Sequence, residues 1–187
     1  PLRTSLQTAT EPYWTDSASF PTSRALDRDL EVDVVVVGGG ITGLTTAYLL
    51  AERGRSVAVF ERGRCAAIDT GHTSAHLTMV TDTRLLKLVK AVGPSHAQAV
   101  WDGGLAAIAQ IDRIVREHQI DCSWEWVDGY LHAPQGDATA REASAFEEEA
   151  TLATELGFDA AFVTDVPLVG DARPLVCDLN AISPATA

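Results

Sequence analysis

The sequence lacks the segments that would place a protein in a membrane or outside the cell. No stretch approaches the roughly 18 consecutive apolar residues of a membrane-spanning helix. The first residues show no basic region followed by an apolar core, which a secretory signal peptide would have. These two absences predict a cytoplasmic protein with no membrane association.

Cysteine and positive charge are also scarce. The three cysteines, Cys65, Cys122 and Cys177, do not form the C-x-x-C pairs of zinc and iron–sulfur sites, so we expect a reducing compartment and no metal site. The chain has 14 basic and 26 acidic residues, which gives a net charge of −12. A surface of this sign repels phosphate backbones and anionic lipids, so neither nucleic acid nor a membrane is an expected partner.

The chain is nevertheless rich enough in apolar residues to fold. Hydrophobic residues make up 46% and charged residues 21% of its 187 positions, which is typical of a globular protein of one domain or slightly more. Residues 32–37 are valines interrupted only by Asp33, a pattern that predicts a parallel strand buried on both faces. A helix is expected from about residue 42 to residue 53, and a second strand over 57–60. This order predicts a βαβ unit.

Three glycines between the first strand and the helix have the spacing G-x-G-x-x-G. Gly38 would allow a tight turn, Gly40 would let a pyrophosphate approach the backbone, and Gly43 would let the helix pack closely on the strand. The free N–H groups of the helix N-terminus favour phosphate binding there. Glu61, at the end of the second strand, stands where a carboxylate can bind a ribose diol and repel a 2′-phosphate. The unit therefore predicts a dinucleotide site that disfavours NADP.

The segment after Glu61 is small, polar and irregular. Thr70, Gly71, Thr73 and Ser74 offer amides and hydroxyls to a pyrophosphate, a ribityl chain or a flavin edge. His72 and His76 have the spacing of a metal pair, but no third ligand is evident nearby, so contact between one of them and a cofactor or active site is the preferred interpretation.

The remaining segments predict an arm and a mixed helical and antiparallel region. Residues 1–30 should be an irregular arm, with Tyr13 and Trp14 packed on the domain surface. Gly103-Gly104 should mark a kink or a close approach within a long helix, and Glu147 to Glu149 a solvated helix face. The other expected elements are a helix over 84–92, a long helix to about 118 capped by Ser95, two strands within 122–132 turning at Asp128-Gly129, a helix over 137–156, a strand over 160–163, and irregular chain from Pro167 onward.

With these residues in view, the chain resembles the N-terminal part of FAD-dependent oxidoreductases of the D-amino-acid oxidase and glycine oxidase type. It is most similar to bacterial members that carry a C-terminal Rieske domain. The resemblance is carried by Tyr13-Trp14, by G-G-G-I-T-G at 38–43 and by T-G-H-T-S-A at 70–75. It implies an α/β fold, in which a Rossmann-type βαβ FAD-binding unit carries an inserted α+β segment of helices and an antiparallel hairpin. The implied division is an arm (1–30), the FAD-binding unit with its flavin-proximal loop (31–82) and the start of a substrate domain (83–187).

The resemblance implies oxidation of an amine or amino acid by hydride transfer to FAD, without identifying a catalytic residue. The residues expected to hold FAD are Gly38, Gly40, Ile41, Thr42, Gly43, Glu61, Arg62, Thr70, Gly71, His72, Thr73 and Ser74. Family members are longer, and the Rieske ligand motifs are absent, so the fold is expected to be incomplete relative to the family. The resemblance leaves open a fragment, a truncated product, or one subunit of a split enzyme whose fold a partner chain or self-association would complete. A non-catalytic nucleotide-binding or partner module and an NAD-dependent oxidoreductase remain as alternatives.

Overall fold

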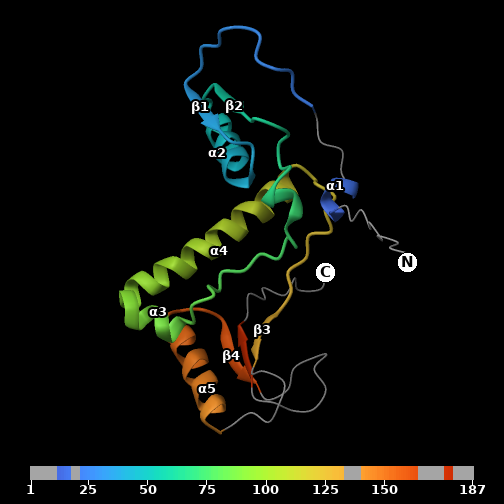
Figure 1. Cartoon of the computed structure of the whole chain (residues 1–187). Helices are drawn as coiled ribbons and strands as arrows, with labels where there is room; N and C mark the ends of the chain where they lie inside the picture. Colours follow the sequence, from blue (N-terminus) through green and yellow to red (C-terminus); the bar gives the residue numbers. More distant parts are fainter. Residues whose placement is uncertain (1–11, 18–21, 133–139, 164–174, 179–187) are drawn as a thin grey trace, which may run out of the picture. The chain divides into compact units, whose positions relative to one another are not determined.

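The computed structural model describes residues 12–17, 22–132, 140–163 and 175–178 (Figure 1). The chain divides into two compact units, residues 1–76 and residues 77–187. The first unit contains α1 (Tyr13–Ser17), β1 (Val34–Val37), α2 (Ile41–Glu52), β2 (Val57–Phe60) and the 3₁₀ helix η1 (Asp69–His72). The second contains α3 (Leu85–Val92), α4 (Pro94–Glu117), β3 (Gly129–His132), α5 (Ala140–Glu155), β4 (Ala160–Val163) and β5 (Leu175–Asp178).

In the first unit, β1 and β2 form a small parallel sheet. Their register runs from Val34 opposite Val57 to Val37 opposite Phe60, which confirms the predicted parallel pairing. Asp33, the residue that interrupts the valine run, joins the starts of the two strands. Its Oδ2 accepts hydrogen bonds of 2.8 Å from both the amide and the hydroxyl of Ser56.

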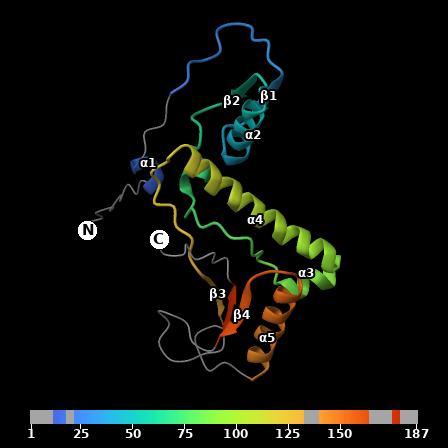
Figure 2. The ribbon, with the colours of Figure 1, turned by 180° about the vertical axis from the view of Figure 1, so that it is seen from behind.

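The prediction that both faces of β1 are buried is wrong for the described chain. Val36 faces α2, since its Cγ1 lies 3.3 Å from the position that a Cβ on Gly43 would take. Val35 and Val37 point the other way and are 54% and 85% exposed. Among the described residues, α2 packs against the two strands (Figure 2), so only one face of this sheet has a cover.

The N-terminal arm is not wholly irregular, because it contains the helical turn α1. The Nε1 of Trp14 donates a hydrogen bond of 2.7 Å to the carbonyl of Thr73, so Trp14 packs on the domain as predicted. The rings of Tyr13 and Trp14 meet edge to face, with their centroids 4.9 Å apart, yet Tyr13 is 69% exposed. Residues 1–11 and 18–21 of the predicted arm lie outside the described residues.

The second unit packs three helices with an antiparallel sheet of order β3-β5-β4. Its main core contains Met79, Leu85, Ala97, Trp101, Ala153 and Phe158. Gly104 makes the predicted close approach, because a Cβ on it would lie 2.8 Å from the Cα of Met79. No helix in the described part of the chain combines the length and apolarity needed to cross a membrane.

Three predictions for this unit are wrong. Helix α4 begins at Pro94 after Gly93, and Ser95 is not its cap, because a proline at the first helical position already has the required φ. Asp128-Gly129 is not a hairpin turn, since β3 pairs with the distant β5 and residues 122–128 form no strand. Strand β5 itself was not predicted, because its partners are distant in sequence. The rest of the irregular chain expected from Pro167 onward lies outside the described residues.

Glu149 is also a correction, because it does not belong to a solvated face. Its side chain points from α5 toward α3, and the residue is only 4% exposed. Oε1 accepts a hydrogen bond of 3.4 Å from the amide of Leu86, in the first turn of α3. Oε2 has no partner among the described residues. Desolvation raises the pKa of Glu149 above its ordinary value, although the amides of Leu85 and Leu86 act in the opposite direction.

Candidate cofactor-binding site

The turn between β1 and α2 depends on Gly38 and Gly43 for its shape. Gly38 has a φ of 103°, which side chains rarely tolerate, and its amide donates 2.8 Å to the carbonyl of Phe60 at the end of β2. A Cβ on Gly43 would lie 2.0 Å from the carbonyl oxygen of Gly38. The fold itself therefore requires both glycines, whatever binds there.

Gly40 differs from these two, because the fold does not require it to be glycine. Its φ is −81°, and the nearest atom to a Cβ would be the hydroxyl oxygen of Thr70 at 3.5 Å, an ordinary contact. The absence of a side chain at this position leaves open space beside the helix N-terminus. Such space is what a phosphate needs in order to reach the backbone.

The first turn of α2 has amides available for an anion. Leu44 is the first residue whose amide bonds within the helix, to the carbonyl of Gly40 at 2.9 Å. The amide of Ile41 donates to the hydroxyl of Thr70 at 3.1 Å. The amides of Gly40, Thr42 and Gly43 have no acceptor among the residues that the structure describes. These N–H groups and the positive end of the helix dipole favour a negatively charged ligand.

Glu61 braces this turn from the end of β2. Its Oε2 accepts a hydrogen bond of 2.8 Å from the amide of Gly39, and its Oε1 accepts one of 2.8 Å from the amide of Gly63. The Gly39 amide first, and the Gly63 amide second, hold the pKa of Glu61 below its ordinary value. The carboxylate is therefore ionised at neutral pH. Each oxygen has a further lone pair with which it can accept a ligand hydroxyl.

Of the predicted flavin-proximal residues 70–74, only Thr70 contacts the turn between β1 and α2 among the contacts of the described residues, and the others contact other residues. Gly71 is buried, and a Cβ on it would lie 2.4 Å from the carbonyl of Ala66, so its role here is packing. The Nδ1 of exposed His72 donates 2.7 Å to the carbonyl of Ile68. The hydroxyl oxygens of Thr73 and Ser74 accept from the amides of Ala75 and His76, and both side chains remain exposed.

Arg62 is exposed beside Glu61, and its charge contributes the smallest of the effects that lower the pKa of that carboxyl. Among the described residues, no three His, Cys, Asp or Glu side chains gather in the way that a metal site requires. The site is thus built from backbone amides, one carboxylate and hydroxyl groups. This donor set suits the phosphates and ribose of a dinucleotide.

Three residues that shape the turn were not predicted from the sequence, namely Gly39, Cys65 and Ala66. Gly39 is buried, and a Cβ on it would lie 2.7 Å from the Sγ of Cys65. The amide of Ala66, a residue with a φ of 57°, donates 2.9 Å to the carbonyl of Gly39. Gly39 occupies a position at which the G-x-G-x-x-G motif allows any residue. The sequence indicated its role only by placing three glycines in succession.

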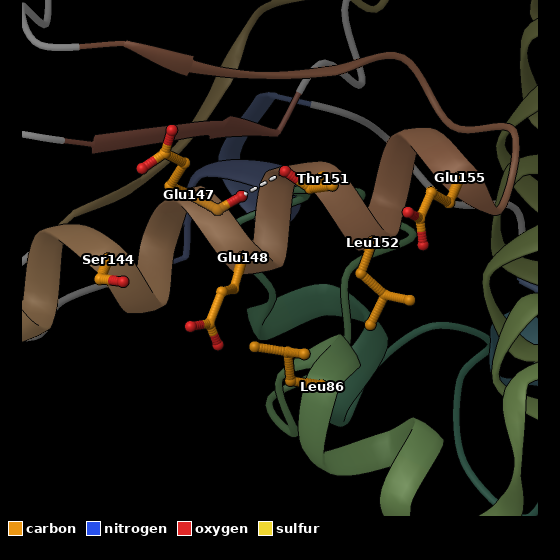
Figure 3. A pocket seen from close by; sticks show the side chains of 7 residues that line it. All are labelled: Leu86, Ser144, Glu147, Glu148, Thr151, Leu152 and Glu155. Carbon is orange, nitrogen blue, oxygen red and sulfur yellow. Dashed lines mark hydrogen bonds between the residues drawn. The ribbon is translucent and has the colours of Figure 1, made fainter.

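The second unit has a shallow groove of about 480 Å³ between α3 and α5 (Figure 3). Its lining residues are Leu86, Ser144, Glu147, Glu148, Thr151, Leu152 and Glu155. The hydroxyl of Thr151 is used within α5, where it donates to the carbonyl of Glu147 at 2.8 Å (Figure 3). Three carboxylates on an open surface oppose the binding of a phosphate-bearing cofactor. The turn of the first unit is therefore the better candidate.

Comparison with known proteins points to the same chemistry. The profile of the family described as "FAD dependent oxidoreductase" matches residues 33–175. The chain is 36% identical over 160 residues to YhfW of Bacillus subtilis, whose name describes a Rieske 2Fe-2S iron-sulfur protein, and the match covers 86% of this chain and 31% of that protein. It is 29% identical over 116 residues to the gamma-glutamylputrescine oxidoreductase of Escherichia coli, covering 62% of this chain and 27% of that protein.

A shorter match has a higher identity. The D-amino-acid oxidase of Streptomyces coelicolor is 60% identical over 37 residues, which are 20% of this chain and 12% of that protein. The chain therefore spans a third or less of the length of these relatives. No solved structure gives a significant match.

Proposed function

The chain belongs to the family of FAD-dependent oxidoreductases, and from this premise we propose that its first unit binds the ADP half of FAD for the oxidation of a small amine or amino acid. The family is FAD-dependent, and the names of two relatives, a D-amino-acid oxidase and a gamma-glutamylputrescine oxidoreductase, describe substrates of these classes. When bound, FAD supplies the hydride acceptor. The chain's own residues bind and orient it.

The observation that carries the proposal is the open position at Gly40. A ligand phosphate can reach the free amides of Thr42 and Gly43 only if nothing fills the space above Gly40. Apart from the chain neighbours of Gly40, the nearest described atom to a Cβ placed there is the hydroxyl oxygen of Thr70, at 3.5 Å. Glu61 lies at the end of the neighbouring strand, with lone pairs left for a ribose diol.

Each predicted ligand has a distinct role in this proposal. The pyrophosphate accepts hydrogen bonds from the first turn of α2, and the ribose hydroxyls donate to Glu61. Arg62 and the exposed polar groups of His72, Thr73 and Ser74 face solvent, where they are available to the rest of the cofactor. Gly38, Gly43 and Gly71 act through the backbone shape that they permit.

The order of elements after β2 favours FAD over NAD. A nicotinamide-dependent domain would continue the alternation of parallel strands and helices. Here η1 comes directly after β2, and the sheet of the second unit is antiparallel.

The proposal is tested by the flavin content of Gly40→Val. The purified wild-type chain, incubated with FAD and freed of excess, should absorb near about 370 and 450 nm, as oxidised flavins do. Gly40→Val should remain folded by circular dichroism, because its Cβ meets only an ordinary contact, yet lose these bands because its methyl groups fill the phosphate space. Equal flavin content in the two proteins would contradict the proposal, as would a wild-type chain that takes up no flavin.

A further inference from the structure

Within the described part of the chain, the N-terminal helix α1 lies beside η1 and is hydrogen-bonded to the residue that follows it. The indole Nε1 of Trp14 donates 2.7 Å to the carbonyl of Thr73, at a sequence separation of 59 residues. One residue further on, the Cγ2 of Thr15 lies 3.4 Å from the position that a Cβ on Gly71 would take. Pro12 closes the turn of α1, because its carbonyl accepts from both the amide and the hydroxyl of Thr15. Helix α1 is therefore fixed against η1 and the residue after it.

The helix η1 lies in turn against the start of α2. The hydroxyl of Thr70 accepts from the amide of Ile41 at 3.1 Å, and the same oxygen is the nearest atom to the open position at Gly40. Gly40, the N-cap residue of α2, has no side chain to make such a bond. Thr70 thus provides, from a distant part of the chain, a hydroxyl acceptor for the first amide of α2, whereas a capping Ser or Thr would serve the second or third.

The two contacts form a continuous path from the arm to the phosphate-binding amides. Trp14 holds the backbone at Thr73, this backbone continues into η1, and the hydroxyl of Thr70 holds the first amide of α2. We propose that α1 is a strap for the cofactor site, and that Trp14 is a positioning residue that increases affinity for FAD through Thr70. The inference rests on the proposed function, because it assumes that FAD binds at the start of α2.

The expected effect is small but measurable. One hydrogen bond between an indole and a carbonyl contributes a modest net free energy, and if all of it reaches the site, its loss weakens binding about five-fold. Trp14→Phe removes the donor and retains an aromatic ring for Tyr13 to contact. Trp124→Phe is the matched control, because Trp124 also stands edge to face with an aromatic neighbour, Trp126, but belongs to the second unit.

The affinity of each full-length variant for FAD can be measured by titration with quenching of flavin fluorescence. Trp14→Phe should bind about five-fold more weakly than the wild type, and Trp124→Phe should bind as the wild type does. Thr70→Val, which keeps the branched shape but loses the hydroxyl acceptor, should also weaken binding. In the double variant the two effects should be less than additive, because both act through the same contact. A purely structural role of Trp14 would leave the effects additive.

A second measurement needs no substitution. Coupling between two sites is reciprocal, so FAD should slow the hydrogen exchange of the Trp14 indole N–H in the ¹⁵N-labelled wild-type chain. Three results would each contradict the proposed role of α1 while leaving the FAD site intact. They are an unchanged affinity of Trp14→Phe, additive effects in the double variant, and unchanged hydrogen exchange of the indole on FAD addition. A wild-type chain that binds no FAD would instead overturn the proposed function.

Discussion

The carboxylate of Glu61 and the amide of Gly39 are joined by a hydrogen bond of 2.8 Å that connects the end of β2 to the turn after β1. The residue predicted to bind a ribose thus also stabilises the turn between β1 and α2. The second oxygen accepts from Gly63 at 2.8 Å, which fixes the carboxylate from both sides. One side chain therefore stabilises the shape of the turn and, in the proposed function, would also bind the ribose of FAD.

Replacement of Glu61 by Gln should change how stability depends on pH. The folded-state pKa of Glu61 is lowered, so its contribution is present above the unfolded value and is lost as the pH falls through the folded value. Thermal unfolding between about pH 7 and pH 3 should therefore show a steeper acid loss in the wild type than in Glu61→Gln. The exposed Glu31 provides the control substitution, Glu31→Gln. If the stability of the wild type and of Glu61→Gln depended on pH in the same way, the proposed contribution of the Glu61 hydrogen bonds to stability would be contradicted.

Replacement of Gly43 by Ala should disrupt the βαβ unit. The new Cβ would lie 2.0 Å from the carbonyl of Gly38, and the backbone must shift to relieve the clash. We expect a loss of about 3 kcal/mol or more in the free energy of unfolding, measured by urea denaturation. Gly40→Ala, whose Cβ has an ordinary contact at 3.5 Å, should cost less than about 1 kcal/mol. Equal costs at the two positions would show that the close approach is not as described.

Adjacent glycines in α4 should respond in opposite directions. A Cβ on Gly104 would lie 2.8 Å from the Cα of Met79, so Gly104→Ala should destabilise the second unit by about 1–3 kcal/mol. Apart from its chain neighbours and the adjacent backbone of α4, no heavy atom of the described chain lies within 4 Å of a Cβ on Gly103. Gly103→Ala should therefore stabilise the helix by about 0.5–1 kcal/mol. Thermal denaturation of both variants tests this contrast, and a loss of stability in Gly103→Ala would refute it.

Replacement of Glu149 by Gln should stabilise the second unit near neutral pH. The folded-state pKa of Glu149 is raised, so the stability that its protonation contributes is present below the unfolded value and is lost as the pH rises through the folded value. Removing the buried charge should increase the free energy of unfolding by about 1 kcal/mol at pH 7 and have less effect near pH 4. The exposed neighbour gives the control, Glu148→Gln. A pH-independent difference between Glu149→Gln and the wild type would count against this role.

Several local features of the fold could be predicted from the sequence because neighbouring residues determine them. The valine run, the glycine spacing and the second apolar run predicted β1, α2 and β2, and the predicted bounds of the helix, about 42 to 53, each differ by one residue from those of α2. Strand β4 was also predicted with its observed bounds. In each case the signal lies within a few residues of the element that it describes.

The failed predictions concern contacts between distant residues. Asp128-Gly129 has the sequence of a hairpin turn, but the partner of β3 is β5, about 45 positions along the chain. Glu149 belongs to an acidic run on the sequence, and only the packing of α5 on α3 buries it. A local pattern cannot report which distant segment supplies the second half of a strand pair or the cover of a side chain.

The sequence by itself determined the cofactor class, because the glycine-rich turn, Glu61 and the Thr70–Ala75 segment are continuous motifs with physical requirements of their own. The tertiary structure decided how these residues divide the work. Gly38, Gly43 and Gly71 serve the backbone, Gly40 leaves space, Thr70 holds the first amide of α2, and Trp14 reaches Thr73 across 59 positions. Those roles depend on distances of a few ångströms between residues far apart in the chain, and such distances exist only once the chain has folded.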